Sequence, residues 1–573
     1  MPYFPARRIT IFAQDPSVEY GGHILRSQIE IPNEELMAGP RGYRVQVVDY
    51  DSSTHTLYKT VPRPPNRFDG PPDDPFVKLS DGALLASPDF HAMSAYAIIM
   101  RTLARFEFAL GRRVAWSFPG HQIQVAPHAF ADANAFYSPE DQALLFGYFP
   151  KTQGKGMIFG CLAHDIVSHE TTHALLDGLR ERYTDPSSPE QAGFHEGFAD
   201  LVALLSVFSL QDVVRKTLDG RRGTQLSAKA VESPSLRHSI LTGLAKQFGQ
   251  ELSGIRANAL RRSVMLTPGQ DYLHDPEFEE PHRRGEVLVA AVMNAFLEAW
   301  SYRLQPYIHV GKLDRGRAVE EGADVADHLL TICIRALDYC PPTDLQFCDF
   351  ASALLTADFE MYPKDEKYRF RKTLLDSFLA YGIKPTSQGS TQPGAWDPPD
   401  VRPVSDRTHF EGMQRDPDEA FRYIWENRKA FHLHANAYTR VLSVRPAVRI
   451  AGDGFALHET VIEYLQLLKI RARELAGLHI EKPKGMADSQ EVTLYGGNAM
   501  IFDQYGLLKY NIGNSIFNAE RQSHRLLNLW NSGVFAPGAS SLRKFAAMHR
   551  ARMLGWSRVA GAKEFVDWTR EKE

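Results

Sequence analysis

The segment "IVSHETTHALLDGL" (166–179) places two histidines four residues apart, with a glutamate directly after the first. On an α-helix, residues i and i+4 lie on one face, so His169 and His173 can present both imidazole rings to one metal ion. Glu170 stands where its carboxylate reaches a water molecule at the metal rather than the metal itself. The pattern alone also fits a polar helix face with two exposed histidines, so the remaining parts of a metal site have to be found elsewhere in the chain.

A second helical segment supplies a third ligand. "GFHEGFADLVALL" (193–205) carries Glu196 and Asp200 four residues apart. A catalytic zinc ion has three protein ligands and one open position, and Glu196 completes such a His₂Glu set. Asp200 lies one turn later on the same face, where it is expected to accept the other ring N–H of a zinc-binding histidine. His195 is a rival ligand, but we expect it to point away from this face. The two segments together predict a zinc site.

These residues resemble the thermolysin-like family of zinc peptidases. Segment 165–177 resembles the family's active-site helix, 134–137 its edge strand, and 144–149 the partner of that strand. Segment 281–296 resembles its proton-donor segment, and 344–383 resembles its closing helices. The resemblance covers about 77–383. It implies an α+β, two-lobed zincin fold, with a β-rich N-terminal lobe, a helical C-terminal lobe and a zinc site between them.

The resemblance also implies a role for each matching residue. It implies that His169, His173 and Glu196 bind zinc, supported by Asp200, and that Glu170 is the general base that activates water. His282 would stabilise the oxyanion, with Asp275 or Glu277 orienting its ring. Tyr183 would assist His282. The expected substrate-binding residues are Asn134 and Ala135 on the edge strand, Arg237, and Ile166 in the pocket after the scissile bond.

The chain departs from the family in two ways. The helix after Asp200 reads "LVALLSVFSLQDVV" (201–214), which offers almost no acids for the family's structural calcium, so no calcium is expected at that site. The start, "MPYFPARRITIFAQDPSVEY" (1–20), lacks the apolar core of a signal peptide, which favours a cytoplasmic protein.

The four cysteines show no CxxC pairing, and this pattern is typical of reduced thiols.

Changes in composition and stretches rich in turn-forming residues predict five parts of the chain. These are a β-rich N-terminal segment (1–76), a β-rich peptidase lobe with an edge strand (77–157), a helical zinc-binding lobe (158–383), a linker (384–408) and a separate C-terminal α/β module (409–573). Two hairpins are expected in the last part, in 445–457 and 498–510. A basic amphipathic helix is expected over 540–556. It could dock a partner or an anionic surface, but the pattern favours packing on its own domain.

Composition limits the partners. The 65 basic and 69 acidic residues give a net charge of −4, which gives no reason to expect nucleic acid, and no segment is apolar and long enough to span a membrane. We therefore expect a zinc-dependent peptidase, most simply an endopeptidase, acting on peptide or protein substrates, with a possible protein partner at the C-terminal module. The alternative is a catalytically restricted or inactive zincin-fold protein that binds or regulates.

Overall fold

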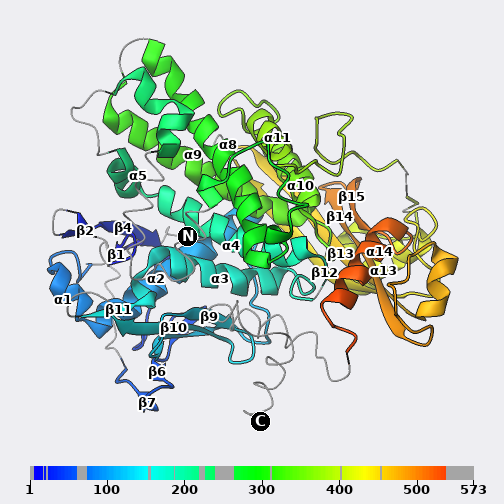
Figure 1. Cartoon of the computed structure of the whole chain (residues 1–573), viewed down its shortest axis with the longest axis horizontal. Helices are drawn as coiled ribbons and strands as arrows, with labels where there is room; N and C mark the ends of the chain where they lie inside the picture. The colour runs from blue at the N-terminus through cyan, green and yellow to red at the C-terminus, as the bar shows by residue number, and fades with distance from the viewer. Residues whose placement is uncertain are drawn as a thin grey trace.

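The structure is a computed structural model of the 573-residue chain. The residues that it describes are 6–16, 19–20, 23–60, 74–151, 156–185, 187–218, 226–238, 263–309, 313–400, 403–404, 406–451 and 454–536. Helices and strands are both plentiful, so the expectation of a mixed α and β protein is confirmed. In Figure 1 the N-terminal strands lie below and to the left, the long helices lie above them, and the C-terminal strands lie to the right. The helix expected over 540–556 lies outside the described residues.

A five-stranded sheet forms the lower layer. Its strands are β5 (Val45–Val47), β8 (Ile123–Phe130), β9 (Ala135–Ser138), β10 (Ala143–Pro150) and β11 (Met157–Phe159). The order is β11-β10-β8-β5, and β9 pairs with β10 outside this path. Strand β9 pairs antiparallel with residues 143–146 of β10, and its other side lies against α3 (His164–Leu179). One short strand is therefore placed directly beside the helix that carries the two histidines.

The long helix α2 (Pro88–Leu110) packs against this sheet. The side chain of Ser87 caps its first turn, and Gly111 ends it in the left-handed conformation, with φ 68°. The helix therefore begins directly after Ser87 and ends at Leu110. The remaining N-terminal elements are β1 (Arg7–Phe12), β2 (Glu19–Tyr20), β3 (His23–Ile24), β4 (Arg26–Ile31), β6 (Tyr50–Asp51), β7 (Thr56–Leu57) and α1 (Asp81–Leu85).

The upper layer is helical. After the 3₁₀ turn η1 (Gly160–Leu162) and α3 come α4 (Pro189–Phe208), α5 (Gln211–Leu218), η2 (Ala228–Val231), η3 (Pro276–Phe278), α8 (Pro281–His309), α9 (Arg315–Ala336), η4 (Leu337–Tyr339), α10 (Phe347–Met361) and α11 (Phe370–Ala380). Helices α4 and α8 approach closely because Gly197 faces Gly285: a Cβ on Gly197 would lie 2.8 Å from the Gly285 carbonyl oxygen. This contact brings the first turn of α8 against the middle of α4.

The C-terminal part is built on an antiparallel sheet of order β12-β13-β14-β15. Its elements are α12 (Phe410–Met413), α13 (Pro417–Glu426), β12 (Tyr438–Ile450), β13 (Ala456–Arg471), η5 (Ala472–Leu478), β14 (Glu491–Asp503), β15 (Leu508–Asn514) and α14 (Ala519–Asn531). The turns between β12 and β13 and between β14 and β15 fall inside the two hairpins expected from the sequence.

Buried charges join this C-terminal sheet to the helical layer. Arg180, directly after α3, pairs with Glu463 on β13, and Arg449 on β12 pairs with Asp338 in η4. Although burial alone would raise it, the guanidinium groups of Arg112 and Arg449 hold the pKa of Asp338 below its usual value. These pairs dock the sheet against the helical layer.

The segment expected to be a linker is also held in place where the structure describes it. The indole N–H of Trp396 donates to the carbonyl of Tyr339 at 2.9 Å, and the backbone N–H of Trp396 donates to the hydroxyl of Thr356 at 2.8 Å. Its Pro, Gly and Ser content makes it irregular, but these contacts fix it against α10 and η4.

Candidate metal centre

Helix α3 brings the two histidines of the opening motif together. His169 and His173 are buried, and their Nε2 atoms lie 2.9 Å apart. Helix α4 adds Glu196, whose Oε2 lies 3.7 Å from each of these nitrogens. Zinc bonds of 2.0–2.1 Å in a tetrahedral arrangement separate neighbouring ligand atoms by about 3.3 Å. The observed separations lie on either side of this value, and the three residues form one of the buried groups able to hold a metal ion.

Both histidines have a partner on the ring nitrogen that faces away from the cluster. The Nδ1 of His169 lies 2.8 Å from Oδ1 of Asp200, which is where the spacing placed that carboxylate. The Nδ1 of His173 lies 2.8 Å from Nδ1 of His195, and the two rings stack with centroids 4.7 Å apart. His195 is therefore buried against the outer side of His173, and the residue group that could hold a metal does not include it. A hydrogen donated from His169 to Asp200 leaves a lone pair on Nε2, facing the metal position.

Glu170 is fully buried and is held by the edge strand. The backbone N–H of Tyr137 on β9 donates to Oε2 of Glu170 at 3.0 Å. The phenol of Tyr137 donates to Asp177 one helical turn past the motif, at 3.0 Å, and burial raises the pKa of that aspartate. These two bonds fix both the strand and the candidate base against α3.

Two of the expected substrate-binding residues, Asn134 and Ala135, lie at the start of β9. Because successive backbone groups of a strand alternate, Ala135 directs its backbone groups to the same side as Tyr137, away from β10. Asn134 precedes the strand, half-buried, and its side-chain oxygen accepts from the N–H of Ala135 at 2.8 Å. Ile166, on the first turn of α3, is buried at 9% exposure.

His282 reaches the cluster from the first turn of α8. Its Nε2 lies 3.3 Å from Oε2 of Glu196, and its Nδ1 lies 3.0 Å from Oε1 of Glu280. The expected orienting acids do not take this place: Asp275 instead caps η3 by accepting from the N–H of Glu277. Sequence reasoning missed Glu280, although its position two residues before His282, at the start of a helix, was an available signal.

Two predicted site residues are not brought to the cluster. Tyr183 is buried at 1% exposure, and its hydroxyl donates to the carbonyl of Pro341 at 2.7 Å. Arg237 contacts Asn294 on α8, and because Asn294 is twelve residues past His282 it lies about 18 Å farther along the helix axis. Each side chain contacts another part of the fold, and neither belongs to the residue group that could hold a metal.

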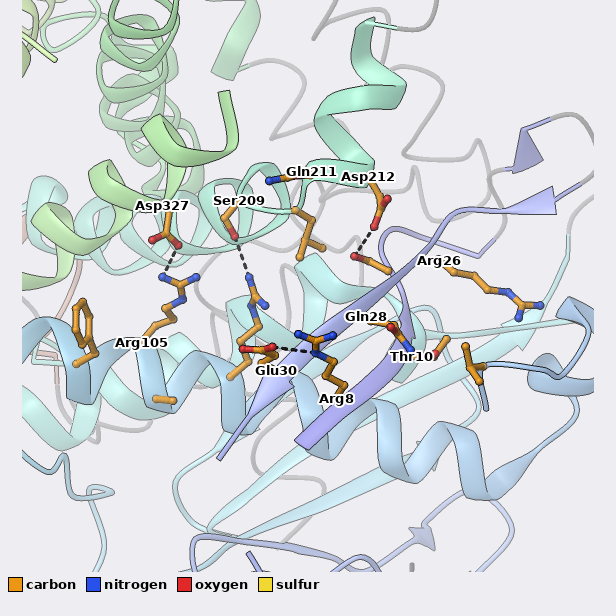
Figure 2. Close-up of a pocket in the computed structure, with 16 residues that line it drawn as sticks. Arg8, Thr10, Arg26, Gln28, Glu30, Arg105, Ser209, Gln211, Asp212 and Asp327 are labelled. Atoms are coloured by element: carbon orange, nitrogen blue, oxygen red, sulfur yellow. Dashed lines mark hydrogen bonds and ion pairs between the residues drawn. The ribbon is translucent and has the colours of Figure 1, made fainter. Parts of the chain in front are cut away.

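A large hollow lies elsewhere in the described structure. Figure 2 shows this space of about 1180 Å³ between β1 and β4, helix α2, the α4–α5 junction and α9. Two pairs of its charged side chains neutralise each other, Arg8 with Glu30 at 2.9 Å and Arg105 with Asp327. The hollow contains none of the cluster residues, so its size does not make it the better candidate for chemistry.

No protein-family model matches this chain, and the curated proteins give no match either. Among the described residues, no single helix is long and apolar enough to cross a membrane, and α4 with α5 meets that requirement only as a bent pair.

Proposed function

We propose that the protein is a zinc-dependent peptidase in which His169, His173 and Glu196 bind the ion. The observation that carries the proposal is the convergence of these three ligand atoms beside a fourth group, Glu170, that is not itself in the ligand set. A thermolysin-like arrangement, with the ion between the edge-strand lobe and the helical lobe, belongs to the same proposal. Its support is the position of α3 between β9 and α4 (Figure 1).

The chain's own residues divide the chemistry among them. A zinc ion held here would polarise water and the carbonyl of a peptide bond. Glu170, fixed by the N–H of Tyr137, accepts the proton of the attacking water and later passes it to the leaving amine. His282 donates from Nε2 to the oxygen of the former carbonyl, while Glu280 holds the opposite ring nitrogen.

The substrate we propose is an extended peptide segment. Strand β9 has one side paired with β10, and its other side lies by Glu170. A peptide that adds there as a further strand would replace the bond from the N–H of Ala135 to the side chain of Asn134. Backbone pairing with Ala135 would align the scissile bond without reading its sequence. Ile166 would then favour an apolar side chain after that bond.

The test is a single change in the base. Glu170→Gln should keep its zinc and reduce kcat/KM by roughly 10²–10⁴-fold, because the ligands stay while the proton acceptor is removed. Glu181→Gln, which makes the same chemical change at a side chain 58% exposed, should cleave like the wild type. Zinc content by elemental analysis and cleavage of a mixed peptide library measure the two properties.

Two outcomes would count against the proposal. Wild-type rates in Glu170→Gln would remove Glu170 from the mechanism. Bound zinc in a wild-type protein that cleaves nothing in the library would favour the alternative, a zincin-fold binding protein. One observation supports that alternative. The hydroxyl of Tyr183, which was expected to assist His282, donates to the carbonyl of Pro341 instead.

A further inference from the structure

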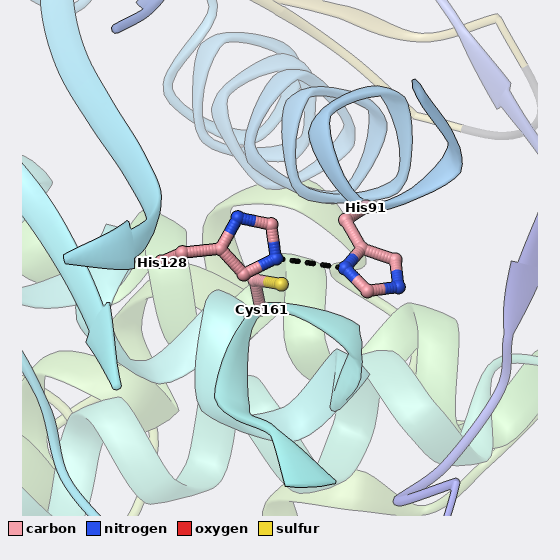
Figure 3. Close-up of side chains that lie close together, drawn as sticks. All are labelled: His91, His128 and Cys161. Carbon is pink, nitrogen blue, oxygen red and sulfur yellow. Dashed lines mark hydrogen bonds between the residues drawn. The ribbon is translucent and has the colours of Figure 1, made fainter. Parts of the chain in front are cut away.

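A second buried cluster joins three elements of the N-terminal half. Figure 3 shows His91 from α2 and His128 from β8 facing each other, with the sulfur of Cys161 from η1 beside them. The Nδ1 of His91, the Nε2 of His128 and the Sγ of Cys161 all lie within 4.8 Å of one another, and all three side chains are buried. None of these residues belongs to the centre on α3.

The outer contacts of the two rings fix where their lone pairs point. The Nδ1 of His128 donates to Oδ2 of Asp49 at 2.7 Å, and the other oxygen of Asp49 accepts the backbone N–H of His128 at 2.9 Å. The Nε2 of His91 donates to the carbonyl of Leu85 at 3.0 Å. A carbonyl has no hydrogen to give, and a carboxylate that accepts an N–H on each oxygen behaves as an ionised acceptor.

Two neutral rings held in this way present lone pairs to each other. The remaining nitrogens, Nδ1 of His91 and Nε2 of His128, lie 2.8 Å apart, and two lone pairs at that distance repel. A positive charge between or beside them removes the repulsion. A proton would satisfy the two nitrogens alone, whereas a metal ion would also engage a third donor, and the structure places Cys161 there.

We propose that His91, His128 and Cys161 bind a second metal ion, a thiophilic transition metal of the zinc or copper class. Two imidazole nitrogens and one thiolate match a zinc site with three protein ligands and also a trigonal copper site, whereas magnesium and calcium select oxygen. Asp49 and the Leu85 carbonyl are the outer partners that hold the rings in place. Binding converts the Cys161 thiol to a thiolate and releases its proton to solvent.

The position of the ion gives it a structural role. It would tie α2, β8 and η1 together, and η1 ends at Leu162, two residues before α3 begins at His164. The ion would therefore anchor the start of the helix that carries His169 and His173. This inference does not depend on peptidase activity, since a binding protein of the same fold would need the same anchor.

Metal content provides the first test. Full-length protein loaded with zinc should hold two ions per chain, and Cys161→Ser and His169→Ala should each hold one. Cys348→Ser is the matched control, because Cys348 lies on α10, away from both clusters, and it should still hold two. Elemental analysis of the protein as isolated then separates zinc from copper as the native ion.

Cobalt substitution provides a test that does not rely on the number of ions bound per chain. The centre on α3 contains no sulfur, so a sulfur-to-cobalt charge-transfer band can come only from a cysteine ligand. The band should appear in the wild type, in His169→Ala and in Cys348→Ser, and it should vanish in Cys161→Ser. Folding of each variant is checked by its thermal melt before loading.

The proposal is overturned if the folded wild type holds one ion and shows no charge-transfer band. It is also overturned if Cys161→Ser holds as much metal as the wild type. A nitrogen-bound proton between His91 and His128, detected by ¹⁵N NMR in zinc-loaded protein, would show instead that an imidazolium ion occupies this place.

Discussion

The two buried histidine pairs of this protein share one construction and differ in what surrounds them. In the pair on α3, the facing nitrogens of His169 and His173 lie 2.9 Å apart, and in the other pair those of His91 and His128 lie 2.8 Å apart. In each pair one histidine donates its other N–H to an aspartate, at 2.8 Å to Asp200 and at 2.7 Å to Asp49. By these contacts alone the two clusters are equally suited to a metal.

What differs is the third donor and the neighbours. The α3 pair has a carboxylate as its third donor, with Glu170 and His282 close by and an edge strand beside it. The second pair has a thiol, and His128 is packed among aromatic rings, with Phe159 at 5.3 Å and Tyr58 at 5.7 Å between centroids. Ligands alone are therefore enough to hold an ion, whereas hydrolysis also requires a base, an oxyanion donor and a place for the peptide.

The largest effect that tests this contrast is expected at His282. Replacing it with Ala should lower kcat by roughly 10²–10³-fold, because one donor to the oxyanion is lost while the zinc ligands remain. His274→Ala is the matched control, since His274 is 85% exposed and pairs only with Asp271 among its described contacts. Initial rates on one cleavable peptide, with zinc content measured in parallel, check the prediction.

Tyr183→Phe sharpens the same experiment. Its hydroxyl donates to the Pro341 carbonyl, so its loss should cost about 1 kcal/mol of stability and leave kcat unchanged. A fall in kcat comparable with that of His282→Ala would show that Tyr183 reaches the substrate after all, and that the packing seen here is not the reacting arrangement.

A smaller effect is expected from the two aspartates behind the histidines. Asp200→Asn should weaken zinc binding at the α3 centre by roughly 10–100-fold, and Asp49→Asn should do the same at the second cluster. At limiting zinc, Asp200→Asn should reduce peptide cleavage more than Asp49→Asn, since Asp49 acts on α3 only through the anchoring ion. Competition with a chelator measures each affinity, and equal losses of cleavage in both variants would contradict the separation of the two clusters.

The sequence predicted one of these clusters and not the other, for a physical reason. His169 and His173 are neighbours through helical geometry, so their spacing reveals them, and Glu196 follows from the same periodicity on the next helix. His91, His128 and Cys161 come from a helix, a strand and a 3₁₀ turn, and their proximity depends on how those elements pack. No spacing along the chain encodes that packing.

The same limit explains why Glu280 was missed near the centre. It precedes α8, whose first turns are brought against α4 by glycines that lie opposite each other in the two helices. The docking of the C-terminal sheet depends on ion pairs such as Arg180 with Glu463, which are 283 positions apart. Local patterns gave the hairpins of that sheet correctly, but they contain no information about the surface on which the sheet packs.

The smallest effect is expected from calcium. Calcium takes six to eight oxygen ligands, whereas each of the two clusters offers two ring nitrogens and one further donor. Next to the α3 centre, residues 201–208 of α4 are buried, and Ser206 is the only one of them with a polar side chain. The melting temperature of zinc-loaded protein should therefore be the same in calcium as in magnesium. Removal of zinc by a chelator, in contrast, should lower it. A melting temperature that rises with calcium alone would reveal an oxygen-rich site, which would be a third centre beside the two proposed here.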